Sequence, residues 1–227
     1  MPMSSVLPFS TKEPATYQAE IVISFPGAAG APGTDAGTDA AETEAGQKYF
    51  IARDGEKRRI DYEFSAKETM SVLEDAGGRT IVLPVQKKCS AEEKTGAGNI
   101  SAPQGEPFSE FLTNGWLAEK IPANFEELSG ENIGGKPLRK FRVRYEKTNG
   151  TGSISEAIVW VDEELGMPVK TEFYSLKDGQ KMNPVTTEFR NIKLSVAPDI
   201  FAKPERCQNI TPKEMQKILW QERLNAE

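Results

Sequence analysis

The chain has 227 residues, of which 37% are hydrophobic and 27% charged, and its formal net charge is −6. This length suits one sheet-based domain, the acidic balance argues against general nucleic-acid binding, and no apolar run reaches the roughly 18 residues that a membrane span needs. The sequence contains no histidine. That absence removes the usual general base, the commonest transition-metal ligand and every catalytic pair that depends on imidazole. We therefore expect no enzyme activity, no cofactor and no metal.

The two cysteines, Cys89 and Cys207, lie 118 positions apart and form no metal-binding spacing. They are either two free buried thiols or one long-range disulfide, which would need an oxidising compartment and would stabilise the fold by roughly 4 to 5 kcal/mol. The first residues show no basic start followed by an apolar segment, so no signal peptide is visible. The chain is then either cytoplasmic or the mature part of an exported protein.

The first half of the chain predicts strands. Tyr17–Phe25 alternates apolar and polar residues, and Gln47–Phe64 is typical of a hairpin around the turn "DGE". Pro26–Gly46 contains no large apolar residue, so we expect a low-complexity mobile loop. The next two strands and the polar loop after them are expected over Thr69–Asp75, Arg79–Lys88 and Cys89–Glu106.

A helical period follows over Pro107–Lys120. Its large apolar residues recur at i, i+3, i+4 and i+8, namely Phe108, Phe111, Leu112 and Trp116. Two interpretations are open for this aromatic face: a static helix that plugs one side of the sheet, or a movable lid over a ligand cavity.

Strands resume after this helix with a segment of alternating character. Its two faces carry Arg139, Phe141, Val143 and Tyr145 on one side and Lys140, Arg142 and Arg144 on the other. The basic face is either a solvated strand face or a surface for an acidic partner or anionic lipid headgroups.

Ser153–Phe189 then predicts three antiparallel strands in a row. The acidic residues Asp162, Glu163 and Glu164 fall at a turn between two of them, which favours a solvated turn over a metal site. A final helix over 211–227 is indicated by the capping box of Thr211 and Glu214.

These elements predict a mainly β (α+β) chain, folded as one domain over residues 1–227. We expect a strongly curved antiparallel sheet of about 9 to 11 strands, with helices covering its concave face. When large aromatic residues line such a curve, the sheet can enclose a cavity for an apolar ligand.

Three stretches carry a family resemblance: "KYFIARDGEKRRIDYEF", "GGRTIVLPVQKK" and "AIVWVDEELGMPVKTEFYSLKDGQKMNPVTTEFRNIKLSVAPDIFAKP". They resemble the LolA-like superfamily of bacterial envelope proteins, which includes outer-membrane lipoprotein sorting proteins and RseB-like sensors. The resemblance implies an antiparallel half-barrel closed by helices, export to the periplasm, and binding of a lipoprotein acyl chain or another lipid without catalysis.

The leading hypothesis is therefore a monomeric, periplasmic carrier-like protein that binds a lipid or an acylated lipoprotein. The alternative is an envelope sensor or interaction module that binds a protein partner through the same scaffold. The candidate cavity residues are Ile21, Ile23, Tyr49, Ile51, Ile60, Tyr62, Phe64, Phe108, Phe111, Trp116, Phe141, Val143, Ile158, Trp160 and Phe173.

Overall fold

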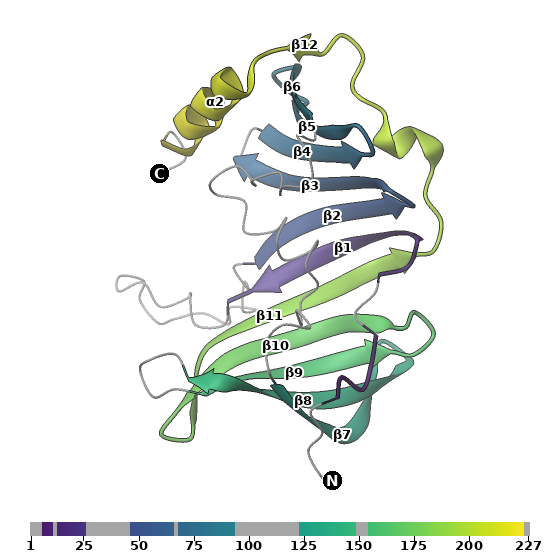
Figure 1. Cartoon of the computed structure of the whole chain (residues 1–227), viewed down its shortest axis with the longest axis vertical. Coiled ribbons are helices and arrows are strands. Elements are labelled where there is room, and N and C mark those ends of the chain that lie inside the picture. Colours follow the sequence, from purple (N-terminus) through teal and green to yellow (C-terminus); the bar gives the residue numbers. More distant parts are fainter. Residues whose placement is uncertain are drawn as a thin grey trace, which may run out of the picture. The chain divides into compact units, whose positions relative to one another are not determined.

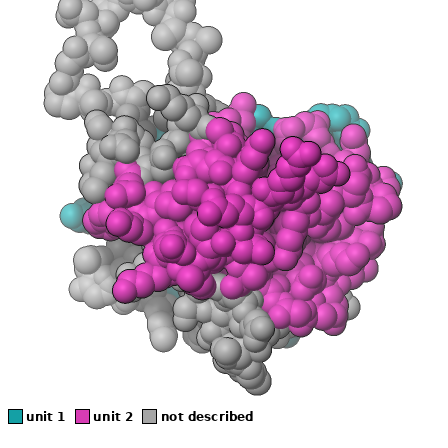
Figure 2. Space-filling model, turned by 90° about the horizontal axis from the view of Figure 1, so that it is seen from above, with its two compact units in different colours: residues 1–14, 22–47, 112–190 teal, residues 15–21, 48–111, 191–227 magenta. Residues whose placement is uncertain are grey.

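A computed structural model of the chain describes residues 6–10, 13–25, 46–65, 68–93, 123–148 and 154–224 (Figure 1). The predicted loop over 26–46, apart from Gly46, and the predicted helix over Pro107–Lys120 lie outside these residues. The chain groups into two compact units, coloured teal for unit 1 and magenta for unit 2 in Figure 2. Unit 1 comprises residues 1–14, 22–47 and 112–190, and unit 2 comprises residues 15–21, 48–111 and 191–227.

Unit 1 is an antiparallel meander in which each strand pairs with its neighbour in sequence. Tight turns make this possible: Asp178 and Gly179 have φ angles of 51° and 78° between two long strands, as two-residue hairpins require. The strands are β7 (Ala123–Ile133), β8 (Lys136–Thr148), β9 (Ile154–Asp162), β10 (Met167–Lys177) and β11 (Gln180–Lys193), of which β11 ends in unit 2.

Each of the four ladders of unit 1 contains one register shift. Bulges of this kind add local right-handed twist and bend the strand that carries them. The long strands β8 to β11 are accordingly twisted along their length in Figure 1. The expected curvature thus has a local cause within this unit.

Unit 2 has the strand order β12-β6-β5-β4-β3-β2-β1. The ladder of β12 with β6 is parallel, and those joining β2 to β6 in sequence are antiparallel. Its elements are β1 (Thr16–Ser24, of which the last residues belong to unit 1), β2 (Gly46–Asp54), β3 (Lys57–Ser65), β4 (Glu68–Asp75), β5 (Gly78–Leu83), β6 (Lys88–Glu93), the 3-10 helix η1 (Pro198–Phe201), β12 (Gln208–Asn209) and α2 (Pro212–Leu224).

The strand β6 corrects the prediction of a polar loop from Cys89 onward. Cys89 and Ser90 are both 1% exposed and pair with Val82 and Ile81 of β5. The pattern was missed because β6 presents small side chains to the interior, which carry little hydrophobic signal. A strand can be held by its neighbour's ladder even when its own apolar pattern is weak.

The C-terminal helix α2 begins at the predicted capping box. Glu214 donates its backbone N–H to Thr211 Oγ1 at 3.2 Å, and Thr211 donates its own N–H to Glu214 Oε2 at 2.8 Å. The bond from the Thr211 N–H, together with a second from the Thr211 hydroxyl to the same carboxylate, lowers the pKa of Glu214. The helix buries Met215 completely against the sheet of unit 2, so the prediction of this helix is confirmed.

The predicted fold class is confirmed: the chain is mainly β, and apart from the short parallel ladder of β12 with β6 the ladders described within each unit are antiparallel. Within the described ranges, eleven strands have six or more residues and β12 has two, close to the expected number. No helix in these ranges is long and apolar enough to cross a membrane.

Candidate functional site

The register of β8 and β9 divides unit 1 into two faces. Phe141 pairs with Val159 and Val143 with Ala157, whereas Lys140 pairs with Trp160. Directly paired side chains point to the same side of a sheet, and successive ones alternate. We call the side of Phe141 the apolar face and the side of Lys140 the polar face. The apolar face is built on the buried cluster of Ala123, Phe125, Phe141, Val143, Ala157, Val159 and Val161.

This register separates the predicted cavity residues of unit 1. Phe141, Val143 and Phe173 belong to the apolar face, since Phe173 pairs with Ala157. Ile158 and Trp160 point to the polar face, beside the basic residues of β8. These five side chains therefore cannot line a single cavity.

The polar face is a ladder of ion pairs. Lys140 Nζ lies 2.9 Å from Glu131 and Arg142 Nη1 lies 2.8 Å from Glu126. Arg144 is hydrogen-bonded to the buried carboxylate of Glu156, which raises the pKa of Arg144. The three basic side chains of β8 that point to the polar face, Lys140, Arg142 and Arg144, thus have carboxylate partners. Their charge is already matched, which weakens the hypothesis that they attract an acidic partner.

Trp160 is held within this ladder. The ring is 5% exposed, with the ammonium groups of Lys140 and Lys170 at 4.8 and 5.0 Å from its centroid. Its Nε1–H donates to Glu131 Oε2 at 2.9 Å. The hydrogen bond from Lys140 and this one from Trp160 lower the pKa of Glu131. These cation–π contacts and the hydrogen bond to a carboxylate hold the Trp160 ring in place, so its contacts are structural.

A short N-terminal segment covers part of the apolar face. Leu7 and Phe9 pack on its buried cluster, and the ring of Phe9 lies 5.0 Å from that of Phe141 and 6.2 Å from that of Phe125. The sequence analysis missed this segment. Its signal is the pair of large apolar residues two positions apart, which an extended chain places on one side.

The apolar face ends in exposed side chains at β10 and β11. Tyr145 packs against the buried cluster, and its ring lies 6.0 Å from that of Phe173. Phe173 is 40% exposed and Met182, which pairs with Ser175, is 41% exposed. Burial raises the pKa of Tyr145 to about 12. The strip from Phe141 through Tyr145 to Phe173 and Met182 is thus uncharged at neutral pH and only partly covered.

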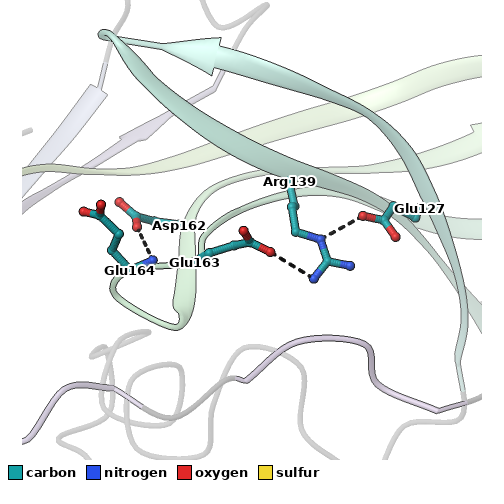
Figure 3. Close-up of polar contacts among 5 residues, drawn as sticks. All are labelled: Glu127, Arg139, Asp162, Glu163 and Glu164. Atoms are coloured by element: carbon teal, nitrogen blue, oxygen red, sulfur yellow. Dashed lines mark hydrogen bonds and ion pairs between the residues drawn. The ribbon is translucent and has the colours of Figure 1, made fainter.

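An arginine borders the apolar face where β8 begins (Figure 3). Arg139 Nε lies 2.8 Å from Glu127, its Nη1 lies 3.3 Å from Glu163, and its guanidinium carbon lies 4.9 Å from the centre of the Phe141 ring. The hydrogen bond with Glu127 raises the pKa of Arg139 and lowers that of Glu127. The apolar face therefore has a polar, ion-paired border near Phe141.

The acidic residues beside this arginine shape a turn. Asp162 Oδ1 accepts the backbone N–H of Glu164 at 2.9 Å (Figure 3). It also accepts the N–H of Leu165 at 3.1 Å, and Lys136 Nζ lies 3.3 Å from Oδ2. Asp162 thus fixes the β9–β10 connection. Across the part of the chain that the structure describes, no group of three or more His, Cys, Asp or Glu side chains could hold a metal ion.

The remaining candidate residues form a row in unit 2. Ile51 pairs with Ile60, and Tyr49 pairs with Tyr62 at a ring distance of 5.8 Å. Burial raises the pKa of Tyr49. Tyr62 packs against the buried cluster that contains Met215 of α2, and Ile218 and Leu219 of α2 pack against the same cluster. The C-terminal helix therefore covers part of this row.

The other candidates are placed as follows. Ile21 and Ile23 of β1 are buried, at 1% and 6% exposure. The side chain of Phe64 and the residues Phe108, Phe111 and Trp116 of the predicted covering helix lie outside the described residues.

Cys89 and Cys207 form a disulfide with a Cα–Cα distance of 5.8 Å. They pack with Leu73 and Val82 on the side of unit 2 opposite Tyr62. The segment between β11 and Cys207 has a second contact: Arg59 Nη1 donates to the carbonyl of Ile200 at 2.5 Å. The irregular segment after β11 is therefore fixed to unit 2 at two points.

No family model and no curated protein matches the chain. Solved structures are similar at low identity. An uncharacterised conserved protein from Thermus thermophilus is 8% identical, with 87% of this chain and 90% of that chain covered and a TM-score of 0.44. A chain of the MucA/MucB complex from Pseudomonas aeruginosa is 14% identical over 86% of this chain and 58% of that one, with a TM-score of 0.40.

A LolA superfamily protein from Nitrosomonas europaea is also similar, at 13% identity, 88% and 93% coverage of this and that chain, and a TM-score of 0.31. Likenesses this distant assign no function to the chain.

Proposed function

We propose that this protein is a non-enzymatic, monomeric binding protein of the bacterial periplasm that holds the acyl chain of a lipid or lipoprotein on the apolar face of unit 1. The observation that carries the proposal is the strip from the buried ring of Phe141 to the exposed Phe173 and Met182. Exposed apolar side chains that continue a buried cluster mark ligand or partner sites more often than scattered ones do.

The chemistry of the strip fits an acyl chain better than a charged ligand. Tyr145 is an uncharged phenol at neutral pH, as tyrosine ordinarily is, and burial raises its pKa further, to about 12. Met182 adds a flexible, polarisable side chain that can adapt to an aliphatic surface. Each methylene buried there would contribute about 0.8 kcal/mol. About six methylenes in contact would therefore contribute about 5 kcal/mol without any hydrogen bond, before the cost of immobilising the chain.

Leu7 and Phe9 cover part of the apolar face, and an acyl chain could displace them. Both side chains pack on the cluster without being fully buried. An acyl chain can lie beside them or replace them at small cost, since apolar contacts are non-directional. The ion-paired Arg139 lies at the border of the apolar face. A lipid headgroup at this border would meet polar side chains.

The disulfide between Cys89 and Cys207 supports the periplasmic part of the proposal. Disulfides persist in oxidising compartments such as the bacterial periplasm and are rare in the cytosol.

Displacement of a fluorescent fatty acid from delipidated protein tests the proposal, with native mass spectrometry of an acylated peptide as a second readout. F173A/M182A should weaken acyl binding about tenfold, which corresponds to about 1.4 kcal/mol. The matched control is V85A/L194A, which removes two exposed apolar side chains outside the strip, 68% and 59% exposed. The proposal is wrong if delipidated wild-type protein binds neither probe, or if the control weakens binding as much as F173A/M182A.

A further inference from the structure

The helix α2 has a second face that the fold does not use. Successive residues of a helix turn by about 100°, so Lys213, Lys217 and Trp220 lie within one narrow stripe. The residues that pack on unit 2, Met215, Ile218 and Leu219, lie on the opposite side. A large aromatic residue therefore stands on the polar side of the helix, beside two lysines.

This stripe is open to solvent. Trp220 is 65% exposed, and Lys213 and Lys217 are both exposed. Among the ion pairs of the described residues, none involves either lysine. This contrasts with Lys140, Arg142 and Arg144 on the polar face of β8, each of which has a carboxylate partner. The ammonium groups on α2 thus keep their charge available for an external partner.

The turn before β6 adds to this positive charge. Lys88 pairs with Gln208 just before the helix, and its charge contributes to the lowered pKa of Glu214 in the first turn of α2. Its neighbour Lys87 is exposed. The one acidic residue of that first turn, Glu214, is engaged by Thr211. The lowered pKa keeps Glu214 negatively charged at neutral pH, so it offsets one of these lysines. Among the described side chains, Lys87, Lys88, Lys213 and Lys217 still leave a net positive charge here, on a chain whose net charge is −6.

We propose that the outer stripe of α2 docks on the surface of a bilayer that contains anionic phospholipid. Tryptophan favours the headgroup region, where its apolar ring and polar N–H both find suitable surroundings. Lysines beside it are attracted by the negative surface potential. Because the inner face of α2 packs on the sheet, the helix lies along the membrane and offers Trp220 as the inserting residue. This inference does not depend on acyl binding by unit 1.

Co-sedimentation with vesicles of phosphatidylcholine, with and without phosphatidylglycerol, tests the docking surface. Wild-type protein should bind the phosphatidylglycerol vesicles, and binding should fall as salt is added. The variant K213Q/K217Q should lower the partition coefficient about 25-fold, since each lysine near an anionic surface contributes about fivefold. W220A should also lower it while the salt dependence remains.

The matched control is K177Q/K193Q, which removes the same charge from two exposed lysines elsewhere. It should change the partition coefficient by less than about twofold, by the additivity of distant sites. Thermal unfolding of each variant verifies that it is folded. Equal binding to both kinds of vesicle, or an equal loss in K177Q/K193Q, would overturn the proposal, as would folded K213Q/K217Q protein that binds like wild type.

Discussion

The pair of Arg144 and Glu156 offers the sharpest test of the two-faced architecture of unit 1. The carboxylate side chain of Glu156 is only 4% exposed, whereas that of Arg144 is 45% exposed. The Tyr174 hydroxyl lies 3.3 Å from the other carboxylate oxygen. Arg144→Met keeps much of the aliphatic volume but removes the guanidinium. The substitution leaves the Glu156 carboxylate buried. Among the described residues, the group still hydrogen-bonded to it is then the neutral phenol of Tyr174.

Breaking a buried ion pair on one side costs about 3 to 5 kcal/mol. Water can replace part of the half-exposed guanidinium, so we expect Arg144→Met to lower the free energy of unfolding by about 2 to 3 kcal/mol. Urea unfolding followed by circular dichroism measures this loss as a lower midpoint at an unchanged slope. The double variant R144M/E156Q removes the uncompensated charge and should recover at least half of the loss.

Arg190→Met is the matched control, because its ion pair with Glu188 lies on an exposed part of β11. An exposed pair contributes about 0 to 1 kcal/mol. If Arg144→Met costs no more than Arg190→Met, the carboxylate of Glu156 is solvated and the polar face is not the ordered ladder described above.

Three further changes have defined outcomes. C89S/C207S should lower the free energy of unfolding by up to about 4 to 5 kcal/mol because it reopens a long loop; urea unfolding with and without reductant should differ for wild-type protein and coincide for the variant. The folded state holds the Tyr145 proton to about pH 12, while the unfolded chain releases it near pH ~10. The contribution of this raised pKa to the free energy of unfolding is therefore fully present below about pH 10 and is lost as the pH rises toward about 12. Tyr145→Phe should flatten that decline in urea unfolding measured at alkaline pH. An unchanged decline would show that this phenol is solvated. Phe9→Ala should lower the free energy of unfolding by about 2 kcal/mol, less than a fully buried ring, because Phe9 is only partly enclosed; no shift in thermal unfolding would mean that residues 6–10 do not pack in solution.

Local chemistry made several elements predictable. The meander from β9 to β11 follows from alternating residues and from turns such as Asp178–Gly179, where a positive φ is needed. The start of α2 follows from the reciprocal bonds of Thr211 and Glu214, which involve residues three positions apart. The alternation of β8 also correctly separated Phe141 from Lys140. Each of these features depends on neighbours in sequence.

The candidate site depended on neighbours in space. Alternation shows that Phe141 and Val143 share a side and that Ile158 and Trp160 share another, but large side chains stand on both sides. The register of β8 with β9 decided that the two pairs point apart. The ion pair with Glu131 on the neighbouring strand decided that the charge of Lys140, beside Trp160, has a partner. A segment distant in sequence decided that Phe9 packs on Phe141.

The sequence by itself determined the class of fold, its turns, its C-terminal helix and the absence of any histidine. Tertiary structure alone decided which side of each strand is covered, where the apolar strip meets solvent at Phe173, and that Cys89 meets Cys207. The physical reason is the two-residue period of a strand: it makes side chains on one face equivalent locally, and only contacts from remote segments make one face the interior.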